Sequence, residues 1–188
     1  MKTILIKSTL ILFIFSFFSC DDSNEIKEVQ LLDNPSIEDG DQSPFSWFHI
    51  NGSYNSEWTD EHSYDGSKSL MMTSGNDNGD FGYWGQSIVN DIPYGRKLRL
   101  SCQIKLDGIS GEGVHIAFRG DGKDVYDKIF FHTTQGTTTI SGDKDWQRYS
   151  VEMIEPIPED VTKIWVFLIL GSNTSGTVYF DEVSLQPF

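Results

Sequence analysis

The chain has few cysteines and few basic residues for its length. Among 188 residues there are two cysteines, and 14 Lys and Arg stand against 28 Asp and Glu, so the formal net charge is −14 at pH 7. Binding to a nucleic-acid backbone needs clustered Lys and Arg that neutralise phosphates. No such cluster occurs, so we expect no nucleic-acid partner. The composition is otherwise that of a globular protein and not of a disordered or fibrous one.

Motifs for common enzyme classes are also lacking. The four histidines (His49, His62, His115 and His132) are dispersed, and none forms a zinc-binding helical pair with an adjacent Glu. No Gly-x-Ser-x-Gly elbow, phosphate-binding Gly-x-x-x-x-Gly-Lys loop or dinucleotide-binding Gly-x-Gly-x-x-Gly segment is present. Acidic residues are abundant, but a glycosidase needs two carboxyls at a defined separation, which their number does not establish. We therefore expect a protein that is not an enzyme.

The N-terminus is typical of a signal peptide. Lys2 and Lys7 lie within the first seven residues. Residues 8–18 form an apolar run that is too short to span a membrane comfortably as a helix. Ser19 and Cys20 follow directly, which resembles the lipobox of bacterial lipoproteins. The resemblance implies removal of residues 1–19, acylation of Cys20 and a short tether over residues 20–28. An uncleaved anchor helix and a plain secretory signal are the alternatives.

Removal of residues 1–19 leaves 12 basic against 28 acidic residues, a net charge of −16. Charge attraction to anionic lipid is therefore excluded, and the lipid anchor is the expected contact with the membrane. Asp21 and Asp22 resemble the acidic signal that sends some lipoproteins to the cell surface. The expected location is the outer membrane or the cell surface, with the side of the membrane left open. Cys102 has no disulfide partner once Cys20 is acylated, so we expect a buried thiol.

Residues 29–188 read as one all-β domain. Apolar and polar residues alternate over 98–106 and 114–119, and further strands are predicted over 146–154 and 176–185, with turn clusters between them. Asn34, Pro35 and Gly40 predict a short first strand. Residues 164–170 are apolar at every position, which indicates either a strand covered on both faces or one whose second face lines an aromatic cleft. Two packed antiparallel layers, a β-sandwich, follow from this pattern.

Several segments, taken in order, resemble the carbohydrate-binding modules of families 4, 9 and 22. They are residues 32–40, Trp47, residues 66–70, 86–88, the strand from Leu98, residues 145–149 and residues 176–185. The resemblance implies a galactose-binding-like β-jelly roll that binds a sugar chain across a concave sheet or at loop tips. It also implies a structural calcium ion held by Glu38, the carbonyl of Lys68 and Asp181, and hard oxygen ligands of this kind suit Ca²⁺. Exposed turn acids are the alternative reading of Glu38 and Asp181.

Sugar binding needs aromatic faces for pyranose rings, with planar polar groups beside them for the hydroxyls. Strand parity and the adjoining loops suggest a set of candidate sugar-binding residues. For each tryptophan in the set the alternative role is core packing, and for the arginine it is an ion pair. The set is Trp58, Tyr83, Trp84, Gln86, Gln103, His115 and Arg119. The expected function is non-catalytic glycan binding by a lipid-anchored module outside the cytoplasm. A structural or protein-interaction lipoprotein with partners in the cell envelope is the alternative, and a glycoside hydrolase is a distant third.

Overall fold

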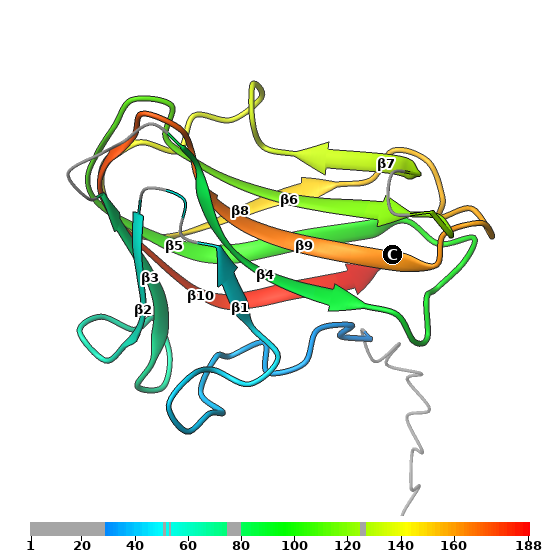
Figure 1. Cartoon of the computed structure of the whole chain (residues 1–188), viewed down its shortest axis with the longest axis horizontal. Helices are drawn as coiled ribbons and strands as arrows, with labels where there is room; N and C mark the ends of the chain where they lie inside the picture. Colours follow the sequence, from blue (N-terminus) through cyan, green and yellow to red (C-terminus); the bar gives the residue numbers. More distant parts are fainter. Residues whose placement is uncertain (1–28, 51, 53, 75–79, 125–126) are drawn as a thin grey trace, which may run out of the picture.

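The computed structural model describes residues 29–188 except 51, 53, 75–79 and 125–126 (Figure 1). The predicted signal peptide (1–19), Cys20 and the tether (20–28) lie outside the described residues. Within the described part of the chain, no helix is long and apolar enough to cross a membrane.

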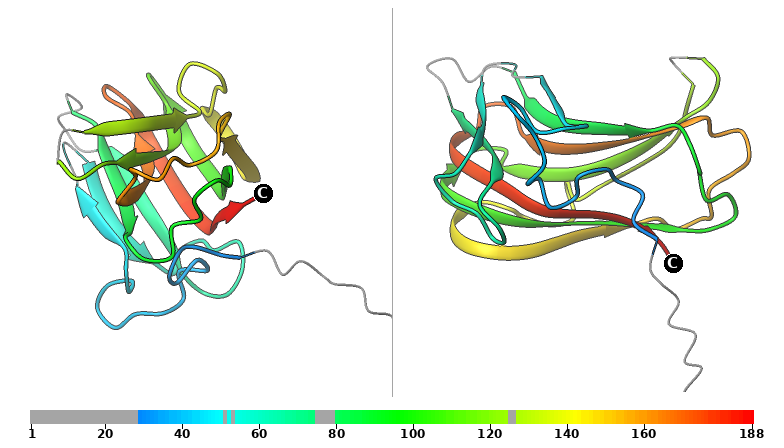
Figure 2. Two further views of the ribbon diagram at one scale, coloured as in Figure 1. Left: turned by 90° about the vertical axis from the view of Figure 1, so that its right-hand side faces the viewer. Right: turned by 90° about the horizontal axis from the view of Figure 1, so that it is seen from below.

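In the described part of the chain, ten strands form two five-stranded antiparallel sheets. The first sheet has the order β1-β4-β9-β6-β7 and the second has the order β2-β3-β10-β5-β8. Figure 2 shows the two layers facing each other. The strands are β1 Phe48–Ile50, β2 Tyr54–Thr59, β3 Ser69–Ser74, β4 Gly82–Ile88, β5 Leu98–Ser110, β6 Val114–Asp121, β7 Lys128–Thr133, β8 Gly142–Glu152, β9 Lys163–Leu170 and β10 Ser175–Pro187. This arrangement confirms the predicted all-β sandwich with a jelly-roll architecture.

Period-two alternation explains why these segments pair as strands. In β5, Leu98, Leu100, Cys102 and Ile104 are all fully buried between the sheets, while Arg99 on the opposite face is exposed. The predicted strands at 98–106, 114–119, 146–154, 164–170 and 176–185 correspond to β5, β6, β8, β9 and β10. The thiol of Cys102 lies in the core as predicted, and burial raises its pKa well above the ordinary range.

The prediction of a short first strand near Asn34 and Gly40 is wrong. Residues 29–45 contain no strand, and Gly40 forms only an isolated bridge with Pro44. The segment instead lies along β10, where the Leu31 amide donates to the Leu185 carbonyl and the Val183 amide donates to the Pro35 carbonyl. Asn34 and Ile37 have positive φ angles of 46° and 65°, which interrupt regular strand geometry.

Strand β9 resolves the ambiguity of its continuous apolar run. Ile164, Val166, Leu168 and Leu170 are fully buried, whereas Trp165, Phe167 and Ile169 are half-buried on the other face. That second face lines an aromatic groove, so the second of the two sequence-based interpretations is confirmed.

Candidate ligand-binding groove

The outer face of the first sheet carries three rows of side chains, because residues paired across antiparallel strands point to the same face. The strand register places Phe131, Arg119 and Trp165 in one row, Ala117, Phe167, Gly85 and Phe48 in the next, and His115, Ile169, Tyr83 and Ile50 in the third. In the middle row, Ala117 is fully buried and the Phe48 ring lies against Gly85. The side chains that this row offers to the groove are therefore those of Phe48 and Phe167.

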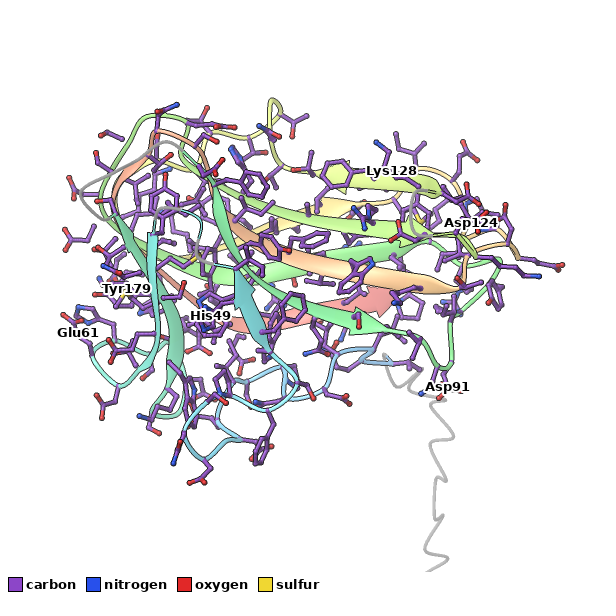
Figure 3. The ribbon with its side chains drawn as sticks, in the orientation of Figure 1. His49, Glu61, Asp91, Asp124, Lys128 and Tyr179 are labelled. Atoms are coloured by element: carbon purple, nitrogen blue, oxygen red, sulfur yellow. The ribbon has the colours of Figure 1, made fainter. Side chains whose placement is uncertain are left out.

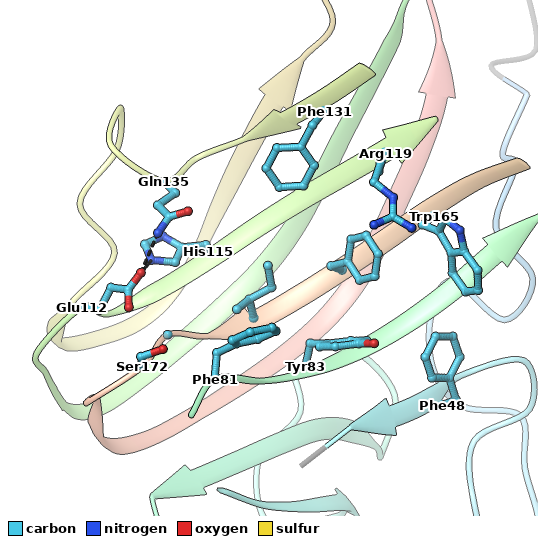
Figure 4. Close-up of a pocket in the computed structure, with 13 residues that line it drawn as sticks. Phe48, Phe81, Tyr83, Glu112, His115, Arg119, Phe131, Gln135, Trp165 and Ser172 are labelled. Atoms are coloured by element: carbon cyan, nitrogen blue, oxygen red, sulfur yellow. Dashed lines mark hydrogen bonds and ion pairs between the residues drawn. The ribbon is translucent and has the colours of Figure 1, made fainter. Parts of the chain in front are cut away.

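Side chains of all three rows line a groove of about 520 Å³ (Figure 4). Its lining consists of Phe48, Phe81, Tyr83, Glu112, His115, Arg119, Phe131, Gln135, Trp165, Phe167, Ile169, Gly171 and Ser172. A mostly apolar hollow with a few convergent polar side chains is the common composition of a small-molecule or oligosaccharide site.

Aromatic rings give the groove two surfaces at right angles. The rings of Trp165 and Phe167 lie 16° from parallel with centroids 6.2 Å apart, and those of Phe81 and Tyr83 lie 19° from parallel at the same separation. Tyr83 meets Phe167 at 90° with centroids 5.2 Å apart. Phe48 packs edge-on against both Tyr83 and Trp165. Each ring is thus held by its neighbours in an edge-to-face or parallel arrangement.

Asp121 at the end of β6 orients two residues of the groove. One carboxylate oxygen, Oδ2, accepts a hydrogen bond from Arg119 at 2.8 Å and from the indole nitrogen of Trp165 at 2.9 Å. The guanidinium of Arg119 also lies 5.8 Å from the centroid of the Phe167 ring. A buried acceptor therefore fixes the rotamers of the arginine and of the largest aromatic side chain.

His115 lies at the opposite end of the groove and is almost completely buried. Burial lowers the pKa of His115 below its ordinary value, and the Glu112 carboxylate 3.8 Å away offsets part of this effect. Neither ring nitrogen has a hydrogen-bond partner among the described residues. Glu112 is itself held by a hydrogen bond from the Gln135 amide. This end of the groove is therefore polar, with a neutral imidazole beside a carboxylate and an amide.

Three of the residues proposed from the sequence, Tyr83, His115 and Arg119, are brought together in this groove. The expectation that Trp84 and Gln86 face outward is wrong, because β4 turns both toward the interior. Trp84 is 2% exposed, and its indole donates to the Met71 carbonyl. Gln86 is 3% exposed and makes paired hydrogen bonds with the backbone of Asp33, so it attaches the N-terminal segment to the sheet.

Gln103 and Trp58 also lie away from the groove. Gln103 does point opposite the core residues of β5, but this is the outer face of the second sheet, where it is buried opposite Arg148 and Asp181. Trp58 packs against the core, donates its indole hydrogen to the Ile37 carbonyl and carries the Lys68 ammonium 5.1 Å from its ring centroid.

The groove contains aromatic residues that the sequence-based candidate set omits. Phe48, Phe81 and Phe131 come from a short edge strand, a loop and an edge strand that carry weak alternation. One feature of the sequence could have indicated Trp165 and Phe167. Residues 164–170 are apolar at every position, whereas apolar and polar residues alternate in other strands of the chain.

The residues expected to hold calcium converge on the loop at 63–68. The Glu38 carboxylate accepts hydrogen bonds from the Ser67 and Lys68 amides, and Asp181 accepts them from the Tyr64 and Asp65 amides. Burial raises the pKa of Asp181 to about 6. Backbone N–H groups thus occupy carboxylate oxygens that an ion would need, and among the described residues no group of three or more His, Cys, Asp or Glu is placed to hold a metal. Calcium binding stays a prediction.

No family model matches this chain, and no curated protein matches it. One similar solved structure is tailspike protein 4 of bacteriophage CBA120, with a TM-score of 0.60 and 14% identity over 85% of this chain. The chain spans only 21% of the length of that tailspike structure. A Stig cyclase from Fischerella sp. TAU, solved with an indole compound, matches with a TM-score of 0.62 and 15% identity over 86% of this chain and 98% of the cyclase. A family 61 carbohydrate-binding module in complex with β-1,4-galactotriose matches with a TM-score of 0.55 and 16% identity over 85% of this chain and 99% of the module.

Modules of carbohydrate-binding families 4 and 22 share the fold as well, at 21% and 16% identity. The fold is therefore the jelly roll of carbohydrate-binding modules, as predicted from the sequence.

Proposed function

We propose that this chain binds a glycan non-covalently in the groove on the outer face of the first sheet. The observation that carries the proposal is the pair of aromatic surfaces at right angles, Trp165 with Phe167 and Phe81 with Tyr83, beside the polar side chains of Arg119 and Gln135. A pyranose ring has apolar faces that pack against aromatic rings and a rim of hydroxyls that need planar donors and acceptors. The groove supplies both.

The arrangement of acids favours binding over hydrolysis. A glycosidase places two carboxyl groups across the scissile bond. In the described lining of the groove, Glu112 is the sole carboxylate, and the nearby Asp121 is engaged by Arg119 and Trp165. We therefore propose that the groove binds a glycan without hydrolysing it.

We further propose that the module is anchored to the outer membrane through acylated Cys20. The first described residues run beside β10 of the second sheet, where Leu31 hydrogen-bonds to Leu185. The described part of the chain thus begins beside the sheet that does not carry the groove. This geometry supports a groove that stays accessible on an anchored protein.

A planar apolar molecule is a second candidate ligand. The lining contains six aromatic residues, more than the polar side chains that accompany them, and the Stig cyclase with the same fold was solved with an indole compound. Such a ligand would be held by ring packing and would need few hydrogen bonds.

Glycan-array screening of residues 21–188, followed by titration calorimetry, tests the proposal. We expect Trp165→Ala to weaken binding at least about tenfold, since the ring contact contributes on the order of 1.4 kcal/mol. Trp146→Ala is the matched control, because Trp146 is a half-buried tryptophan on β8 of the second sheet. Silence across the array combined with binding of indole would favour the second candidate. Silence toward both would favour a protein-interaction role.

A further inference from the structure

Exposed apolar side chains gather at one end of the sandwich. Eleven large apolar residues of the described chain are exposed, and four of them line or border the groove. Five of the other seven lie at the end that we call the tether end: Val29, Val89, Tyr94, Ile154 and Phe188. Single exposed apolar residues are common on soluble proteins, whereas several at one place indicate a contact surface.

Hydrogen bonds join the C-terminus and the β8–β9 loop at the tether end. The Phe188 amide donates to the Lys97 carbonyl, and the Met153 amide donates to the carbonyl of Leu98, the next residue along the chain. Phe188 and Ile154 therefore lie on either side of the start of β5. Figures 1 and 2 show the β4–β5 loop, the β8–β9 loop and the C-terminus together at this end.

The β4–β5 loop places Val89 and Tyr94 at the same end. Ile88, directly before Val89, pairs with Ile164 at the start of β9. The Tyr94 hydroxyl donates to the Val161 carbonyl of the β8–β9 loop at 2.8 Å. Its polar group is therefore satisfied within the protein, and its ring is the surface that remains for contact with another molecule.

The first described residues lie at the tether end as well. The Leu31 amide donates to the Leu185 carbonyl of β10, close to the C-terminus, and Val29 lies two residues before Leu31. Cys20 precedes Val29 by nine residues in the sequence, which is at most about 30 Å of extended chain. An acyl group on Cys20 would therefore hold this end, and not the opposite one, close to the lipid.

Contact with lipid at this end would be apolar and not ionic. The exposed acids here include Asp91, which Figure 3 labels, together with Glu155 and Glu159. They outnumber the exposed Arg96, so charge does not attract this end to anionic lipid. Ile154 is 72% exposed, the highest value among the large apolar residues of the described chain. Aliphatic and aromatic side chains of this kind are stabilised at the boundary between lipid headgroups and acyl chains.

We infer that the tether end rests on the surface of the lipid bilayer and inserts its exposed apolar side chains at the level of the headgroups. The inference goes beyond glycan binding and rests on the proposed anchoring through Cys20. Strand β6 ends at Asp121, which pairs with Lys163 at the tether end, and begins at Val114 at the far end. The outer face of β6 and β9 is then directed sideways, so lipid would leave the groove uncovered.

Site-specific fluorescence quenching tests the inference on the acylated protein in phosphatidylcholine vesicles that contain a lipid with a nitroxide on its headgroup. A thiol-reactive fluorophore is attached to Ile154→Cys or, in a second variant, to Val89→Cys. Cys102 is fully buried and Cys20 is acylated in this protein, so neither competes for the label. We expect the nitroxide lipid to quench the fluorophore at both positions.

Tyr64→Cys is the matched control, because Tyr64 is 51% exposed and lies away from the tether end. Its amide donates to Asp181, six residues before Pro187 on β10. That separation is roughly 20 Å along a strand, which exceeds the insertion depth of an interfacial contact. The fluorophore at this position should not be quenched. Thermal unfolding verifies that each labelled variant is folded.

Absence of quenching at Ile154→Cys and Val89→Cys in protein that cosediments with the vesicles would overturn the inference and leave the anchor intact. Equal quenching at Tyr64→Cys would overturn it too. A dimer of the acylated protein in detergent that Ile154→Ser abolishes would assign the tether end to a second copy of this chain instead. Failure to cosediment would overturn the anchoring proposal itself. None of these results changes the proposal that the groove binds a glycan.

Discussion

Replacing Gly85 with alanine tests whether the Phe48 ring must lie close against β4 to shape the groove. A Cβ atom at Gly85 would lie 2.8 Å from the Cζ atom of Phe48 and 3.2 Å from the Val166 carbonyl oxygen. The φ angle of Gly85 is not in the positive range, so the backbone accepts alanine. Phe48 is 37% exposed, and its ring can therefore move outward.

We expect Gly85→Ala to change the free energy of unfolding by no more than about 1 kcal/mol. Alanine lowers the conformational entropy of the unfolded chain, which stabilises the folded state by about 0.4–1 kcal/mol. This gain offsets the free-energy cost of displacing an exposed ring. The displaced Phe48 ring would lose its edge-on contacts with Tyr83 and Trp165, which shape the aromatic surface of the groove. Affinity for xylohexaose should then fall about tenfold, a loss of ~1.4 kcal/mol.

Gly120→Ala is the matched comparison on the inner face of the same sheet. Its Cβ would lie 2.3 Å from the ring of Phe130, which is half-buried and packs against the hydrophobic core. Overpacking of this kind costs about 1–3 kcal/mol. Urea unfolding measures both stabilities, and calorimetry measures binding by Gly85→Ala. Equal destabilisation by the two substitutions, or unchanged affinity of Gly85→Ala, would refute the reasoning.

Three further predictions concern the histidine of the groove, the calcium site and the anchor. Because burial lowers the pKa of His115, the unfolded chain binds its proton more readily, so this residue's contribution to stability should decline as the pH falls through about 6.5 toward its lower folded-state value. Urea unfolding of wild type and His115→Gln should diverge over that range, and parallel pH profiles would contradict the burial argument. Calcium should raise the melting temperature, since a ligand that binds only the native state stabilises it, whereas identical melts in EDTA and in calcium would reject the site at Glu38, Lys68 and Asp181. Metabolic labelling with a fatty acid should fail in Cys20→Ala, and unchanged labelling would exclude acylation at that residue.

Much of the fold can be predicted from the alternation of apolar and polar residues along individual strands. In β5 and β6, successive side chains enter different environments, so apolar and polar residues alternate and the strands are predictable. Strand pairing is different, because β10 lies between β3 and β5 through contacts between segments distant in the chain. The prediction of a strand near Asn34 and Gly40 is wrong because the hydrogen bonds of this segment to β10 lack a regular register.

The face of a strand is harder to predict when both parities contain aromatic residues. In β4, Trp84 and Gln86 share a parity with Ile88, while Tyr83 shares the other with Gly85 and Ser87. The apolar Ile88 was a signal for the buried face. Gln86 obscured it, because a buried glutamine is acceptable only where a partner such as the Asp33 backbone satisfies its amide.

Assembly of the groove depends on register more than on composition. Arg119, Trp165 and Phe131 form one row because β6, β9 and β7 pair with a particular offset. A shift of one residue would turn these side chains to the opposite face. Sequence reasoning located His115 and Arg119 by parity and Tyr83 as a residue of an adjoining loop, although Tyr83 lies in β4. It could not show which residues of other strands accompany them.

Backbone amide chemical-shift mapping with xylohexaose tests the central claim most directly. The account predicts that the largest shifts fall on the groove strands, around Tyr83, Arg119, Trp165 and Phe167, and on Phe48 at the sheet edge. Shifts concentrated instead on the outer face of the second sheet, around Trp146 and Tyr179, would contradict it.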